Sequence, residues 1–272
     1  MLDRLNPPKL QRARGRAEVG FVQKSGKSKL QHLHQAGCLK AILPNTHEKE
    51  PEVVFVNTAG GIAGDDQLNI DVSLTQRTSA TFTTQTAERV YRSNGGAGRI
   101  DVKLQVGDGA SLCWLPQETI IFDGAHLKRK LDVELSTNSE ILLLESFMLG
   151  RKAMGEQVTT GAINDRWSIR RDGKLVFAEA LRIDDVSSLL GPAALQDNLA
   201  FATMVFASPD AHLHLERLRA ILQTCNARCA ASAWDGVLIA RFVAADAYVL
   251  RKALIPTIEN FRHAAMPRVW QL

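Results

Sequence analysis

Carboxylate and amide side chains recur shortly after the apolar runs at 80–84, 110–115, 140–144 and 174–178. Burying a carboxylate is costly unless water, a hydrogen bond or a cation compensates it, and oxygen ligands suit hard or borderline metal ions. If the runs stack, these side chains form a polar column through which such an ion could pass. The column would contain Gln85, Glu88, Gln117, Glu118, Glu145 and Glu179. In the alternative, each acid pairs locally with one of Arg89, Arg92, Arg151, Lys152 or Arg182.

A repeated strand supplies the reason to expect stacking. The pattern D-V-x-L begins at Asp71, Asp101 and Asp132, and a polar turn and a second strand follow each copy. A weaker fourth copy begins at Asp165 and contains Asp172-Gly173 as a hairpin turn. A two-strand unit of about 30 residues that needs neighbours to bury its apolar face predicts stacked β layers. Three separate hairpins in a sandwich are the alternative.

A glycine-rich loop follows 53–56, an apolar run that predicts a buried strand. Gly60, Gly61 and Gly64 precede two acids, Asp65 and Asp66. Glycines at this spacing predict a tight loop with positive φ angles. The two carboxylates could bind a cation or could cap turns of the loop.

The flanks complete one predicted domain, 1–272, which is mainly β. Residues 1–20 are predicted to be irregular and 1–16 flexible, and 29–43 to be a strand. On that strand His32 and His34 share a face, as a metal pair or simply as polar residues.

The repeated β units are expected to span 53–185, and a closing part to span 187–272. In the closing part, periodicity predicts helices over 212–223 and 247–262, the second kinked or divided by Pro256. A strand is predicted over 233–243. The fold class is therefore a superhelical stack of β layers with about two flanking helices in its C-terminal third.

Composition excludes some functions. The chain of 272 residues has 33 Lys and Arg against 29 Asp and Glu, so its charge does not indicate a nucleic-acid binder. No apolar run is long enough to span a membrane. No signal peptide is evident, so we expect a cytoplasmic protein whose four cysteines are free thiols.

Catalytic motifs give little support for an enzyme. Neither G-x-S-x-G nor H-E-x-x-H occurs. Glu118 and Asp123 could serve as the carboxylate pair of a β-solenoid carbohydrate-active enzyme, which is the alternative function. Two acids at this spacing are common by chance.

Seven motifs together resemble the urease accessory protein UreD family, called UreH in some species. In order, they are VNTAGGIAGDDQL, TTQTAERVYRS, LPQETIIFDGA, ESFMLGRKAMGE, RDGKLVFAEALR, SAWDGVLIARF and PRVWQL. The resemblance covers nearly the whole chain, from about residue 17 to the end. One departure is Asp65, because the family loop usually has glycine directly before its aspartate.

The resemblance implies a non-enzymatic metallochaperone scaffold with a β-rich superhelical fold. Proteins of this family bind apo-urease and UreF, and UreG through UreF, in a hetero-oligomer in which UreG hydrolyses GTP. The assembly delivers nickel, which is in transit rather than a permanent cofactor. The resemblance also implies an internal path for nickel. By motif position, its candidate residues here are Asp66, Glu88, Ser93, Glu145 and Glu179.

Overall fold

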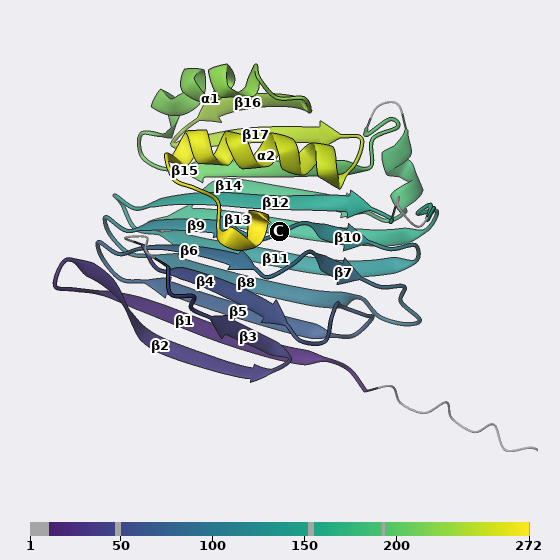
Figure 1. Cartoon of the computed structure of the whole chain (residues 1–272), viewed down its shortest axis with the longest axis horizontal. Coiled ribbons are helices and arrows are strands. Elements are labelled where there is room, and N and C mark those ends of the chain that lie inside the picture. The colour runs from purple at the N-terminus through teal and green to yellow at the C-terminus, as the bar shows by residue number, and fades with distance from the viewer. Residues whose placement is uncertain (1–10, 47–49, 152–154, 192–193, 272) are drawn as a thin grey trace, which may run out of the picture.

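Two β-sheets form the body of the molecule in the computed structural model, which describes residues 11–46, 50–151, 155–191 and 194–271. Their strands lie across the stack in Figure 1, from the N-terminal end at the bottom to the C-terminal helices at the top. The first sheet has the order β14-β13-β11-β8-β5-β1-β2. Its strands are β1 (Arg14–Lys24), β2 (Lys27–Gly37), β5 (Gln67–Leu74), β8 (Gly98–Val106), β11 (Ala125–Leu135), β13 (Gly161–Arg171) and β14 (Lys174–Ile183).

The second sheet has the order β16-β17-β15-β12-β9-β6-β4-β3, and two short strands extend it at one side. Its strands are β3 (Leu39–Ile42), β4 (Glu52–Asn57), β6 (Ser79–Thr84), β9 (Ser111–Leu115), β12 (Glu140–Leu149), β15 (Ala200–Ala207), β16 (Arg228–Trp234) and β17 (Val237–Ala244). The short strands are β7 (Glu88–Val90) and β10 (Thr119–Ile121).

Successive units of the chain stack in parallel. The repeated strands β5, β8 and β11 pair with one another in parallel, and so do β6, β9 and β12 in the opposite sheet. Each repeated unit therefore contributes one strand to each sheet. This confirms the stacked layers predicted from the repeat, and the alternative of three separate hairpins is wrong.

The repeated aspartates are not in register. Asp71 and Asp132 both lie opposite Lys103, the residue between them on β8. A register that aligned the motifs would place like charges side by side, which destabilises neighbouring strands. The two-residue offset alternates the charges instead, while Val72, Val102 and Val133 still face the interior.

Strand β12 is buried on both faces. Its residues Ile141 and Leu143 belong to the apolar core between the two sheets, whereas Leu142 and Leu144 belong to a second core under the helices. By contrast, β8 strictly alternates buried and exposed residues, as a sheet with one solvated face does. The helices α1 (Leu215–Leu222) and α2 (Ala247–Arg262) thus cover the outer face of the second sheet.

The closing part differs from its sequence prediction in two respects. Instead of one strand over 233–243, β16 and β17 form a hairpin through Asp235-Gly236, both at positive φ. Helix α2 runs unbroken through Pro256, so the proline does not divide it. Short 3₁₀ helices complete the region at Val186–Leu190, Ala211–His214 and Arg268–Gln271, and the last of them buries Trp270.

The N-terminal end also corrects a prediction. Residues 14–20 belong to β1 rather than to an irregular segment, because Ala17, Val19 and Phe21 alternate into the core while the basic residues face outward. Residues 1–10 lie outside the described part. Beside β1, the edge strands β2 and β3 expose Leu30, Leu33 and Ile42.

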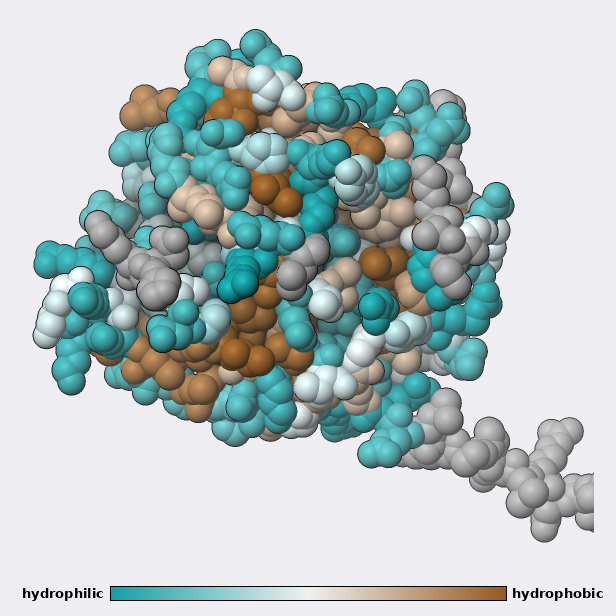
Figure 2. All heavy atoms as spheres, in the orientation of Figure 1, coloured by the Kyte–Doolittle hydropathy of each residue, from teal (hydrophilic) through white to brown (hydrophobic). Residues whose placement is uncertain are grey.

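Apolar side chains gather near the lower edge of the molecule, over its first strands (Figure 2). In the described part of the chain, no helix is both long and apolar enough to cross a membrane.

Candidate functional site

The glycine-rich loop folds tightly over β7. Gly60 and Asp65 have φ angles of 76° and 67°, so the aspartate that departs from the family loop occupies a left-handed position that Asp tolerates. A Cβ on Gly61 would lie 2.3 Å from the Tyr91 ring, and one on Gly64 would lie 2.2 Å from the Ser93 hydroxyl. Both glycines thus permit close approach, as the sequence predicted.

Two candidates for the nickel path, Asp66 and Ser93, are engaged by the main chain. The buried Asp66 carboxylate accepts hydrogen bonds from the main-chain N–H groups of Ala13 at 2.7 Å and Ala63 at 2.8 Å. The Ser93 hydroxyl donates to the carbonyl of Gly96 at 2.6 Å. These contacts give both side chains a role in shaping the loop.

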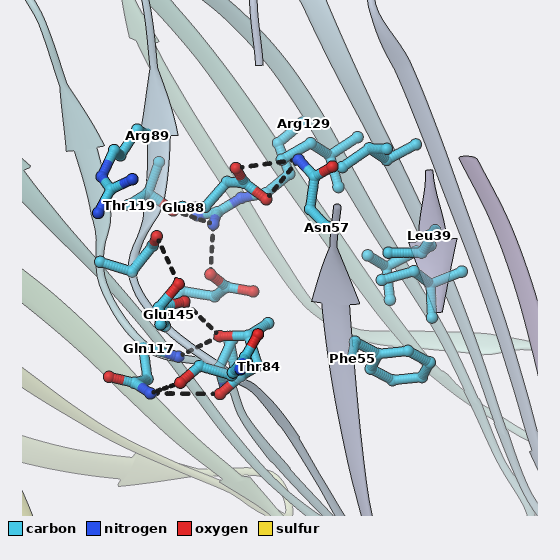
Figure 3. Close-up of a pocket in the computed structure, with 18 of the residues that line it drawn as sticks. Leu39, Phe55, Asn57, Thr84, Glu88, Arg89, Gln117, Thr119, Arg129 and Glu145 are labelled. Atoms are coloured by element: carbon cyan, nitrogen blue, oxygen red, sulfur yellow. Dashed lines mark hydrogen bonds and ion pairs between the residues drawn. The ribbon is translucent and has the colours of Figure 1, made fainter. Parts of the chain in front are cut away.

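A first cavity, of about 100 Å³, lies beside this loop. We call it the Glu88 cavity (Figure 3). Glu88 accepts two hydrogen bonds of 3.2 Å from the side-chain amide of Asn57. Burial raises the pKa of Glu88 to about 7, although Asn57 and Arg89 oppose the rise. The cavity is also lined by Gln85, Gln117, Thr119, Arg129 and Glu145.

Gln117 and Glu118 face opposite sides of the chain, because successive residues of an extended segment alternate. The buried Gln117 amide donates to the carbonyls of Gln85 at 2.7 Å and Val269 at 3.1 Å. Glu118 lies outside the Glu88 cavity and pairs with Arg251 at 3.5 Å. The predicted column therefore includes Gln117 but excludes Glu118.

Three charged residues meet inside the sandwich, which we call the Arg129 cluster: Arg129, Glu145 and Asp165. Each shares the inward face of its strand with apolar neighbours; on β11, Leu127 and Leu131 flank Arg129. Arg129 lies directly opposite Asp165 in the first sheet, and Glu145 reaches them from the second. They are only 5%, 5% and 2% exposed, respectively.

The hydrogen bonds of the cluster are well matched. The Arg129 guanidinium donates to both carboxylate oxygens of Asp165, at 2.9 and 2.7 Å, and forms an ion pair with Glu145. Trp114 and Trp167 each donate an indole N–H, at 3.0 Å, to Glu145 and Asp165 respectively. The carboxylates are thus held by the two tryptophans as well as by the arginine.

The charges shift one another's protonation. Burial raises the pKa of Glu145, with Arg129 opposing the rise. Burial alone would lower the pKa of Arg129, but the carboxylates of Asp165 and Glu145 outweigh it and keep that pKa above its ordinary value. Arg129 is therefore a permanent cation.

A second cavity, of about 470 Å³, begins on the far side of the cluster. We call it the Glu179 cavity. It is lined by Glu145, Asp165, Glu179 and Arg241, and Glu179 forms an ion pair with Arg241. Glu145 therefore lines both cavities.

The alternative, in which the acids pair with nearby basic residues, is correct in that some of them pair with arginines, but the partners differ from those named. Glu145 and Glu179 pair with Arg129 and Arg241, which are distant in sequence. Three of the arginines named from the sequence pair elsewhere: Arg92 with Asp123, Arg151 with Glu156, and Arg182 with Asp184. The fourth, Arg89, favours the charged form of Glu88. Lys152 lies outside the described residues.

Neither histidine candidate forms a recognisable metal centre. His32 contacts Glu18 at 3.1 Å. Across the described ranges, no three His, Cys, Asp or Glu side chains converge as metal ligands.

The two acids of the enzyme alternative lie at opposite ends of β10 in separate contacts. Asp123 accepts hydrogen bonds from the main chain and hydroxyl groups of Thr159 and Thr160. The main-chain N–H groups of these threonines hold the pKa of Asp123 below its usual range. Glu118 faces Arg251 instead.

Comparison with known proteins gives one consistent family. Residues 13–271 match the family model described as UreD urease accessory protein. The chain is 45% identical to the urease accessory protein UreD of Jannaschia sp. over the full length of both chains. It is 43% identical to that of Rhizobium etli, covering 96% of each chain, and 41% identical to that of Agrobacterium fabrum, covering 99% of this chain and 95% of the relative.

Proposed function

Because the chain belongs to the UreD family of urease accessory proteins, which act in urease maturation, we propose that it helps to deliver nickel into apo-urease. In this proposal the chain is a non-catalytic metallochaperone scaffold of the cytoplasm. It binds apo-urease and UreF, and UreG through UreF, and leaves GTP hydrolysis to UreG.

The observation that carries the proposal is the pair of cavities joined at Glu145. A carboxylate stands in each: Glu88 in the first and Glu179 in the second. Carboxylate oxygens bind divalent ions such as nickel less tightly than imidazole or thiolate clusters do, so they suit an ion that must move on. We assign the route to Glu88, Glu145 and Glu179. Asp66 and Ser93 are further candidates, because they lie at the glycine-rich loop beside the Glu88 cavity.

The exposed end of the stack supports action in a complex. Stacked β units need a cap on their terminal units, yet β2 and β3 leave Leu30, Leu33 and Ile42 exposed there. An exposed sheet edge with apolar side chains is a ready template for contact with another chain. We therefore propose that a protein partner covers this end.

The test is urease activation in cells that carry the urease operon and a fixed nickel supply. Without the chain, we expect urease polypeptide to accumulate with little nickel and little activity. Normal nickel-loaded urease in its absence would overturn the proposal.

Single substitutions test the route itself. We expect Glu179→Ala and Asp66→Ala to lower the nickel content of urease several-fold, while the chain still co-purifies with UreF. The matched control is Glu134→Ala, because Glu134 is an exposed glutamate on the outer face of β11. Nickel loading equal to that of the control would exclude the substituted residue from the route.

A further inference from the structure

The Arg129 cluster lies where the two cavities meet, and its arrangement has a consequence for any cation that passes. Arg129 lines the Glu88 cavity, Asp165 lines the Glu179 cavity, and Glu145 lines both. The guanidinium therefore lies where the lining of the Glu88 cavity meets that of the Glu179 cavity. Figure 3 shows Arg129 and Glu145 among the residues of the Glu88 cavity. A cation that moved from one cavity to the other past Glu145 would therefore meet Arg129.

The two carboxylates of the cluster are already arranged around a positive charge. Asp165 binds the guanidinium through both its oxygens, and Glu145 binds it from the opposite sheet. Trp114 and Trp167 hold the same carboxylates independently of the arginine. If the guanidinium moved away, Glu145 and Asp165 would still be oriented toward one point.

Charge balance favours exchange of the guanidinium for a divalent ion. Two ionised carboxylates and one guanidinium leave a net charge of −1 in the interior, and an unbalanced buried charge is costly. A divalent cation between the same carboxylates would neutralise them. The displaced guanidinium has a nearby acceptor in Glu88, which lines the same cavity and whose side-chain hydrogen bonds come from Asn57.

We propose that Arg129 is a displaceable gate, and that a divalent cation crosses between the cavities by taking the place of its guanidinium between Glu145 and Asp165. The gate rests on the proposed route, because it describes one step of it. It keeps the boundary closed when no cation is present. No covalent or redox step is involved: one cation replaces another.

Binding of Mn²⁺ to the purified full chain, followed by electron paramagnetic resonance, tests the gate without urease. We expect Arg129→Met to bind one Mn²⁺ at least tenfold more tightly than the unmodified chain, and Arg129→Met with Asp165→Asn to lose that gain. Lys128→Met is the matched control, because it removes the neighbouring cation on the outer face of β11. Binding to folded Arg129→Met no tighter than to this control would overturn the gate.

Arg129→Lys provides the measurement if Arg129→Met does not fold. Lysine keeps the charge but cannot bind Asp165 through two parallel hydrogen bonds, so we expect tighter Mn²⁺ binding and a higher melting temperature with Mn²⁺ than without it. Equal melting temperatures would overturn the gate.

The route and the gate fail in different ways. If Glu179→Ala lowers nickel loading but the Arg129 variants gain no affinity for Mn²⁺, the route stands without the gate. If the Arg129 variants bind Mn²⁺ but Glu88→Ala and Glu179→Ala both load urease normally, the cluster is a cation site outside the route, which overturns the gate as well.

Discussion

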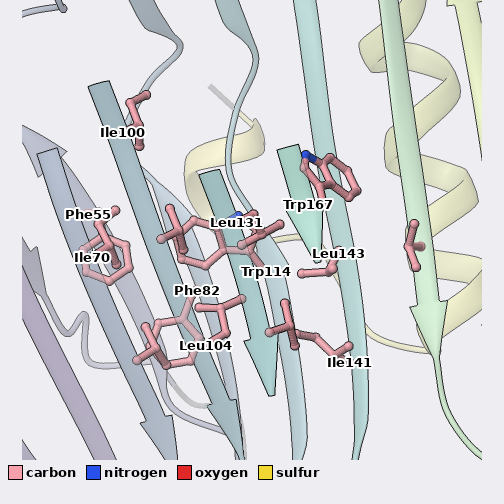
Figure 4. Close-up of a cluster of buried hydrophobic side chains, with 14 of the residues drawn as sticks. Phe55, Ile70, Phe82, Ile100, Leu104, Trp114, Leu131, Ile141, Leu143 and Trp167 are labelled. Atoms are coloured by element: carbon pink, nitrogen blue, oxygen red, sulfur yellow. The ribbon is translucent and has the colours of Figure 1, made fainter. Parts of the chain in front are cut away.

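On strand β12, Leu143 and Glu145 face the same interior but meet opposite kinds of neighbour. Leu143 lies in a layer of aromatic and aliphatic side chains (Figure 4), in which Phe55 packs against Phe82 and Trp114 with ring centroids 6.2 and 5.9 Å apart. Glu145, two residues later, lies in the Arg129 cluster between two cavities. The first layer is filled with apolar atoms, whereas the second is charged and bordered by empty space.

This difference indicates what each layer is for. Apolar burial stabilises a fold by about 25 cal/mol per Å², but a buried ion pair contributes little net stability, because desolvation offsets its attraction. The apolar layer therefore accounts for folding. The cluster has no comparable value for stability, and the proposed route would give it a function instead.

The largest loss of stability is expected from breaking the cluster on one side. Asp165→Ala removes the acceptor of two N–H groups of Arg129 and of the Trp167 indole. Each buried donor left unsatisfied costs about 1–3 kcal/mol, so we expect the free energy of unfolding to fall by about 3–5 kcal/mol. Urea denaturation measures it. Asp101→Ala, on the exposed face of β8, should change it by less than about 0.5 kcal/mol. If both substitutions changed the free energy of unfolding equally, the cluster would be exposed to solvent rather than buried.

A cavity in the apolar layer is expected to cost slightly less. Leu143 is fully buried, and Leu143→Ala should lower the free energy of unfolding by about 3 kcal/mol. Leu175→Ala, at a half-exposed leucine, is the control. Urease activation per folded chain should stay normal in Leu143→Ala. A loss of activation beyond the loss of folded chain would give the apolar layer a role in the route.

Glu88 should make stability depend on pH. Burial raises its pKa to about 7 from an ordinary value of 4.5, so between these pH values the folded chain retains a proton that the unfolded chain has lost. The free energy of unfolding therefore falls as pH rises through this window, by roughly 2 kcal/mol.

The amide in Glu88→Gln cannot ionise, so the variant should lack this part of the pH dependence. Urea denaturation at pH 5 and pH 7.5 measures the difference between the two proteins. Parallel pH profiles would show that Glu88 titrates normally, and hence that the Glu88 cavity is well hydrated.

Much of the fold and part of the site could be predicted from the sequence. The repeat predicted stacked β layers, and stacking places Gln85, Glu88, Gln117 and Glu145 around one cavity. The tight conformation of the glycine-rich loop was also predicted, because glycine permits the positive φ angles and the close backbone approach that such a loop needs. Glu118 was misplaced, since a one-residue step reverses the face of an extended segment.

Arg129 was missed, although a signal for it exists. It is the middle residue of Lys128-Arg129-Lys130, which looks like an exposed basic run, yet it has the same alternation as Leu127 and Leu131. Alternation along β13 likewise places Asp165 on the same face as Ile163 and Trp167. The pairing of Glu179 with Arg241 leaves no such signal, because it depends on how two sheets face each other.

Replacing the whole cluster should separate stability from function most sharply. In the variant Arg129→Met, Glu145→Met, Asp165→Leu, no buried charge of the cluster is left unpaired, and apolar side chains of similar size fill the space. Such replacements are often neutral or stabilising, but here the Trp114 and Trp167 indole N–H groups lose their acceptors, at about 1–3 kcal/mol each. We therefore expect the free energy of unfolding to fall by about 2–4 kcal/mol, no more than in Asp165→Ala. Nickel loading of urease should nevertheless fall to the level seen without the chain, because the boundary between the cavities then offers a cation no oxygen ligand. A stable triple variant that loads urease normally would show that nickel does not cross there. The Arg129 cluster would then have no role in nickel transfer.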